Sequence, residues 1–235
     1  MLKSWSILLL SLFMVLQLAT TFPQREQANP TDGVQQQQQA ANSAENSFEN
    51  ELSAPRKQLL FGTLTLLTKQ SKSILVESRT FLKHLINEMK ALPNKSAAIE
   101  RNITRLDEVL HKIDAIDLDA NPPLVDEMFS AVDELGKVYD EFYGMPESTD
   151  PQSDVVNLEN LFEKVGSESL EQRLNNSLQA TLNEFPKLFE TFKQTLIDAE
   201  QQNETQLLEW YRRFKTENDN EKKFNLLEEF WTFFK

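Results

Sequence analysis

The stretch LFGTLTLLTKQSKSILVESRTFLKHL, residues 60–85, decides the fold of this chain. Its apolar and small side chains recur at alternating steps of four and three residues, which places them on one face of a helix. They are Leu60, Leu64, Leu67, Ser71, Ile74, Ser78, Phe81 and Leu85. Pro55 favours a helix start and Pro93 ends the pattern, so the sequence predicts one long helix over residues 55–92.

Further stretches along the chain repeat this coiled-coil-like spacing. They begin near Ser96, Val125, Asp154, Ser167 and Phe224. The two serines in this set are suitable N-cap residues, and Pro186 predicts a kink inside the fifth helix. No segment shows the period-two alternation that is typical of strands. We therefore expect an all-α fold, an antiparallel bundle of about five to six amphipathic helices, in a domain spanning residues 55–235.

The N-terminal residues have the layout of a secretory signal peptide. A positive charge at Lys3 precedes an apolar run at Ile7–Leu18, and small residues follow at Ala19–Thr21. Because the run is too short to span a bilayer, we expect residues 1–21 to be cleaved and the protein to be secreted, with no transmembrane span. Residues 22–54 are rich in Gln and Asn and poor in bulky apolar side chains, so they are predicted to form a disordered arm.

The charge and the lack of cysteine narrow the possible functions. The net charge is −13 at pH 7, which disfavours nucleic acids and anionic headgroups as partners and favours solubility. The chain contains no cysteine, although extracellular proteins can form disulfides. Thiol nucleophiles and cysteine-ligated metals are therefore excluded, and burial of an apolar core has to stabilise the fold without covalent cross-links.

Four N-glycosylation sequons are present, and a secretory route would make them functional. They begin at Asn94, Asn102, Asn175 and Asn203. The first falls in a predicted loop, whereas the second shares a helix flank with Val109 and Ile116. If the heptad of the fifth helix continued unbroken, Asn203 would lie in the core, where a glycan cannot be accommodated. Either the register shifts near Gln201 or this sequon is unused.

One segment resembles a calcium-binding loop in part. Asp117, Asp119 and Asn121 have the spacing of the first three ligands of an EF-hand loop. Pro122 stands where that loop needs glycine, and Met128 stands where it needs a bidentate glutamate. We therefore interpret the segment as a helix end followed by an acidic cap, and we expect no calcium site.

The remaining candidates for chemistry are the two histidines, His84 and His111. If two antiparallel helices brought them together, Glu88 or Asp107 could complete a two-histidine, one-carboxylate metal site. Neither histidine belongs to a paired i, i+4 zinc motif, and no phosphate-binding loop or nucleophile elbow is visible. We expect no catalytic residue, no metal and no cofactor, and therefore no enzyme.

The C-terminal segment Phe224–Phe234 is apolar around most of its circumference. Such a helix is either sandwiched between other helices or held ready for a partner. The sequence leaves both alternatives open: a terminal helix docked against the core, or a surface for an apolar ligand or a partner. That surface would consist of Phe224, Leu227, Phe230, Trp231 and Phe234.

These features together predict a secreted, N-glycosylated, non-catalytic helical protein that binds a macromolecular partner in an extracellular fluid. The alternative is a carrier of lipid or another apolar ligand held between the helices. Its cavity would be lined by Phe185, Phe189, Phe192, Trp210, Phe230 and Trp231. A secreted, cysteine-free chain of long amphipathic helices is similar in architecture to the exchangeable apolipoproteins, which implies a helical architecture and no particular function.

Overall fold

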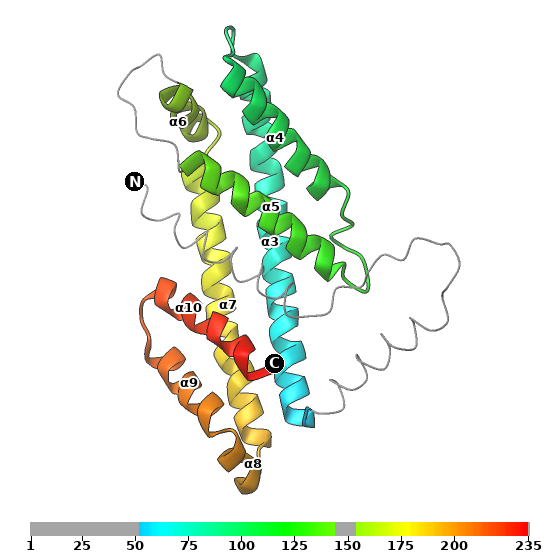
Figure 1. Cartoon of the computed structure of the whole chain (residues 1–235), viewed down its shortest axis with the longest axis vertical. Coiled ribbons are helices and arrows are strands. Elements are labelled where there is room, and N and C mark those ends of the chain that lie inside the picture. The colour runs from blue at the N-terminus through cyan, green and yellow to red at the C-terminus, as the bar shows by residue number, and fades with distance from the viewer. Residues whose placement is uncertain (1–51, 144–153, 235) are drawn as a thin grey trace, which may run out of the picture.

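The computed structural model describes residues 52–143 and 154–234, and this part of the chain is entirely helical (Figure 1). It contains eight α-helices and one 3-10 helix, with no strand among the described residues, so the all-α prediction is confirmed. The predicted signal peptide and nearly all of the predicted arm lie outside the described residues. Within 52–143 and 154–234, no helix has the length and apolar content needed to cross a bilayer.

Helix α3 (Ala54–Ala91) is the element that the heptad predicts, and its bounds agree with the sequence to within a residue. Pro55 lies in its first turn, and the helix ends two residues before Pro93. Every heptad position except the half-buried Leu64 is buried, including the two serines. The small serine side chains let neighbouring helices approach α3 closely, and Ser78 lies against Tyr139 of α5, whose phenol pKa is raised by burial.

Helix α7 (Ser167–Thr195) lies antiparallel to α3 and makes the most extensive contact with it. Contacts occur in opposite order along the two helices: Glu77 with Arg173, Gln70 with Thr181, and Gly62 with Leu188. At the last of these, a Cβ added to the glycine would lie 3.1 Å from a leucine methyl group, so the missing side chain allows the close approach. Helix α7 continues through Pro186.

Helices α4 (Ala97–Asp114), α5 (Val125–Tyr143) and α6 (Asp154–Lys164) surround the C-terminal half of α3 (Figure 1). The predicted cap of α4 is confirmed, because the Ser96 hydroxyl accepts a hydrogen bond from the backbone N–H of Ile99 at 3.1 Å. The prediction that Ser167 caps α7 is wrong. Gly166 is the N-cap and has a left-handed φ of 88°, a backbone conformation that glycine adopts without steric cost.

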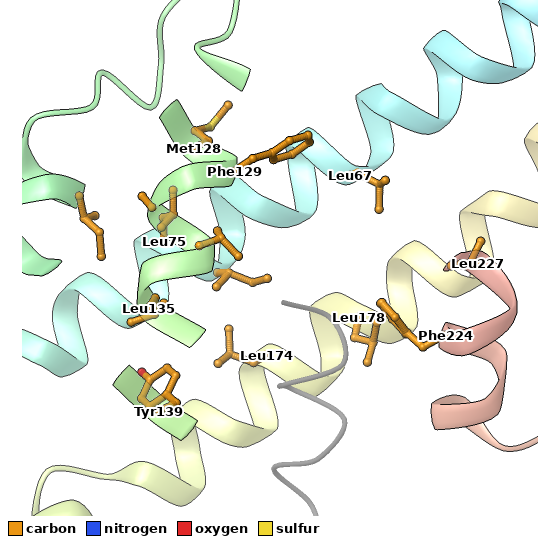
Figure 2. Packing of buried hydrophobic residues seen from close by; sticks show 14 of the residues in the cluster. Leu67, Leu75, Met128, Phe129, Leu135, Tyr139, Leu174, Leu178, Phe224 and Leu227 are labelled. Atoms are coloured by element: carbon orange, nitrogen blue, oxygen red, sulfur yellow. The ribbon is translucent and has the colours of Figure 1, made fainter. Parts of the chain in front are cut away.

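The C-terminal part contains more helices than the sequence predicts. After α7 the chain forms α8 (Asp198–Asn203), α9 (Thr205–Thr216), α10 (Asn220–Phe230) and the 3-10 helix η1 (Trp231–Phe234). The expected number of five to six helices is therefore too low. Helix α10 turns back towards the middle of α7 and α3, and Figure 2 shows Phe224 and Leu227 of this helix among inward-facing residues of the other helices.

Candidate functional site

An extensive aromatic cluster lies between α7, α9, α10 and η1. Its centre is Trp210, whose ring centroid lies 5.4–6.1 Å from the centroids of five phenylalanine rings. These belong to Phe185, Phe189, Phe214, Phe230 and Phe233. The indole N–H donates to the carbonyl of Leu226 at 2.8 Å, so the one polar atom of this buried side chain is satisfied.

The edge of the aromatic cluster is fixed by polar contacts around Glu190. The ring of Tyr211 stacks on Phe189 with centroids 3.9 Å apart, and its hydroxyl lies 3.1 Å from the Glu190 carboxylate. The Lys215 ammonium group lowers the pKa of Glu190 to about 2, and Lys193 contributes in the same direction. Burial and the adjacent carboxylate raise the pKa of the Tyr211 phenol, so it remains a hydrogen-bond donor at neutral pH.

The lowered pKa of Glu190 makes a pH dependence testable. A carboxylate whose folded pKa of about 2 lies below the unfolded value of 4.5 stabilises the fold above pH 4.5 and loses that contribution as the pH falls towards 2. We expect Glu190→Gln to reduce the free energy of unfolding at pH 7 by at most about 1 kcal/mol, because the side chain is partly exposed. The difference from wild type should disappear near pH 2, measured by urea unfolding; an equal difference at both pH values would contradict this assignment.

The structure places all five residues of the expected C-terminal surface inside the protein. Phe224, Leu227, Phe230, Trp231 and Phe234 are each at most 4% exposed. Of the two alternatives that the sequence leaves open, these exposures match the docked terminal helix and do not match an open surface. Apolar side chains cover most of the circumference of α10 and η1 because these two elements contact the rest of the core on more than one side.

Two hollows near this cluster open to solvent and are lined mainly by polar side chains. The first lies between α9 and α10 and is lined by Arg213, Thr216, Glu217, Lys222, Asn225, Leu226 and Glu229. The second lies along α8 and α9 and is lined by Asp198, Gln201, Gln202, Thr205, Leu208 and Arg212. Neither is lined by the six residues that the carrier alternative requires, since those side chains contact one another in the core.

The structure gives the four sequon asparagines different environments. Asn94, in the loop between α3 and α4, and Asn203, at the end of α8, are exposed. Asn102 in α4 and Asn175 in α7 are half-buried on the sides of long helices. The register shift near Gln201 that Asn203 requires is present, because α7 ends at Thr195 and the chain restarts as the short helix α8.

The residues considered for metal binding have other partners. Asp119 forms an ion pair with Lys72 at 2.6 Å, and this ammonium group lowers the pKa of the carboxylate. Glu88 pairs with Lys164, and Asp107 pairs with Lys90. Both histidines are exposed, and among the described residues no three His, Cys, Asp or Glu side chains are grouped closely enough to hold a metal ion.

A largely buried ion pair that the sequence patterns do not indicate joins the start of α3 to the junction of α8 and α9. Arg56 in the first turn of α3 contacts Glu204, which lies between α8 and α9, at 2.7 Å. The side chain of Glu204 is only 10% exposed, and the guanidinium group also lies 5.5 Å from the ring centroid of Phe234 in η1. Glu204 is the middle residue of the fourth sequon, so the buried carboxylate directly follows the exposed asparagine.

No protein-family model, curated protein or solved structure matches this chain.

Proposed function

We propose that this chain is a secreted, N-glycosylated, non-catalytic protein, built as an antiparallel bundle of amphipathic helices, that binds a macromolecular partner in an extracellular fluid. The observation that supports this proposal best is the closed aromatic cluster around Trp210. Because its rings occupy the space between α7, α9 and α10, recognition has to use the outer faces of the helices.

The carrier alternative has less support in the geometry of the cluster. Its six lining residues are each at most 3% exposed, and rings such as Phe230 and Trp231 lie in edge-to-face contact with centroids 5.1 Å apart. An acyl chain could enter only if these contacts opened, which would cost the burial free energy of several aromatic side chains at once. A binding protein that uses its outer surface needs no such opening.

The proposal is tested in two ways: by expressing the chain through a secretory route, and by purifying the natural protein from its native fluid. We expect the secreted product to start after residue 21, to lose mass on N-glycosidase treatment, and to co-purify with a macromolecule in a defined stoichiometry. Mass spectrometry and lipid extraction of the same sample separate the alternatives. A stoichiometric lipid and no macromolecular partner would support the carrier, and retention of Ile7–Leu18 in the product would contradict the signal peptide.

The exposures of the sequons predict which of them carry glycans. We expect Asn94 and Asn203 to be occupied, since a glycan at either site projects into solvent without disturbing the core. Asn94→Gln and Asn203→Gln should each remove one glycan mass from the secreted protein. Thr205→Ala is the matched control for the second site, because it destroys the sequon and leaves the asparagine in place. An unchanged mass in the Asn203→Gln variant would contradict this prediction.

A further inference from the structure

Basic side chains lie along one face of α3. In the C-terminal half of the helix, carboxylates of α4 and of the turn that follows it form ion pairs with these basic side chains. The pairs are Lys90 with Asp107, Arg79 and Lys83 with Asp114, and Lys72 with Asp119. The structure thus contains one example of an element that this face accepts: an amphipathic helix that runs antiparallel to α3 and presents carboxylates to its basic side chains.

The same face continues into the N-terminal half of α3, where Lys57 and Lys69 have no acidic partner among the described residues. Residues 54–76 contain four basic side chains and no acidic one, in a chain whose net charge is −13. Arg56 and Lys72 pair with Glu204 and Asp119. Lys57 and Lys69 form no ion pair with any described residue. Between them lies Phe61, which is 52% exposed, and Val76 farther along is 44% exposed. Residues 57, 61, 65 and 69 follow one another at i, i+4 spacing, so they form a continuous stripe.

We propose that this stripe, which we call the basic ridge (Lys57, Phe61, Thr65, Lys69), binds an acidic amphipathic helix of a partner protein. The partner helix would lie where the line of α4 continues along α3, with carboxylates opposite the two lysines and an apolar residue against Phe61. This inference rests on the proposed partner-binding function and names the surface and the chemistry of the partner. Charge complementarity and the exposed phenylalanine specify that chemistry, and α4 provides its structural precedent.

Two other occupants fit this surface less well. An anionic membrane is flat, so much of an acidic molecule would face it and be repelled. A narrow helix lies within the Debye length of about 8 Å of the two lysines and is attracted by their local charge. A second copy of the chain could repeat the α3–α4 contact only by supplying α4 or its neighbour α5. The α4 carboxylates Asp107 and Asp114 are already paired within the molecule, and Phe61 would meet no large exposed apolar residue on α5.

The test uses the secreted chain and a fluorescein-labelled synthetic peptide of residues 97–119, the acidic segment that the C-terminal half of α3 already accepts. Fluorescence anisotropy should show saturable binding at 50 mM NaCl that weakens at 500 mM NaCl. The Lys57→Glu/Lys69→Glu variant should bind about tenfold more weakly, because two attractive pairs become repulsive. Phe61→Ser should also weaken binding. Circular dichroism checks that the helix content of each variant is unchanged.

Matched controls distinguish the basic ridge from overall charge. Lys112→Glu/Lys222→Glu changes the net charge by the same amount at two exposed lysines elsewhere and should leave the affinity unchanged. A peptide with Asn in place of Asp107, Asp114 and Asp119 should not bind. Equal losses in both double variants, or equal binding of both peptides, would overturn the proposal. Binding to phosphatidylserine vesicles or self-association in sedimentation, abolished by Lys57→Glu/Lys69→Glu, would assign the surface to a membrane or a second copy.

Failure of this inference can be separated from failure of the proposed function. If a macromolecule co-purifies from the native fluid and binds the Lys57→Glu/Lys69→Glu variant as well as wild type, partner binding stands and the assignment of its surface is overturned. If no macromolecule co-purifies although the acidic peptide binds the basic ridge, the surface assignment stands and the proposed extracellular function fails.

Discussion

Replacement of Trp210 by alanine is expected to reduce the free energy of unfolding by about 3–5 kcal/mol, the largest effect of any single substitution considered for this chain. The side chain is 1% exposed and contacts aromatic rings from α7, α9, α10 and η1, so its removal leaves a cavity at the point where four elements meet. Urea unfolding followed by far-UV circular dichroism measures the change, and the midpoint should fall.

A more conservative variant separates packing from hydrogen bonding at this position. Trp210→Phe keeps an aromatic ring but removes the indole N–H that donates to Leu226, and should cost less than the alanine variant. Trp231 remains in both variants and lies in the same cluster, so its fluorescence reports whether the cluster stays closed. A loss of less than about 1 kcal/mol in Trp210→Ala would show that α9 and α10 are not held against α7 as described.

Glu204→Gln is expected to cost about 2–3 kcal/mol, the second largest effect. Breaking a fully buried ion pair typically costs more, but the Arg56 side chain is 26% exposed and can regain some hydration. The substitution leaves a guanidinium group near Phe234 without its counter-charge, and it keeps the Asn-x-Thr sequon intact. Thermal and urea unfolding of the secreted protein measure the loss of stability without a change in glycosylation.

The matched control for this ion pair replaces both charges. The double variant Arg56→Met/Glu204→Leu should be less destabilised than Glu204→Gln, since two apolar side chains of similar volume avoid the desolvation of an unpaired charge. A double-mutant cycle over the two positions then isolates the interaction between them. A double variant as unstable as the sum of the two single losses would show that the ion pair contributes nothing beyond independent contacts.

The long helices could be predicted from the sequence because local and tertiary preferences agree in them. The heptad that begins at Leu60 gave the bounds of α3, and the cap at Ser96 gave the start of α4. The end of α7 could not be predicted in the same way. No glycine or proline marks it. At the break Leu196 is buried whereas the adjacent Ile197 is 66% exposed, and which of the two is buried depends on tertiary contacts.

The candidate sites show the same division between local and tertiary information. The sequons are local patterns and could be located, but the environment of Asn203 depends on where α7 ends. The apolar circumference of the segment Phe224–Phe234 was visible in the sequence, yet sequence alone could not decide between core and surface. The basic ridge did leave a sequence signal in the absence of acidic residues from 54 to 76, but its unpaired state follows only from the position of α4.

The contact of Arg56 with Glu204 and Phe234 brings the first turn of α3 against the last turn of the described chain. A stretching force applied between residues 54 and 234 would therefore load this contact before any long helix carries tension. Once this contact opens, the aromatic cluster around Trp210 would bear the load that detaches η1, α10 and α9. The protein would then lengthen in steps from its carboxyl end, while α3 and α7 stayed joined until last.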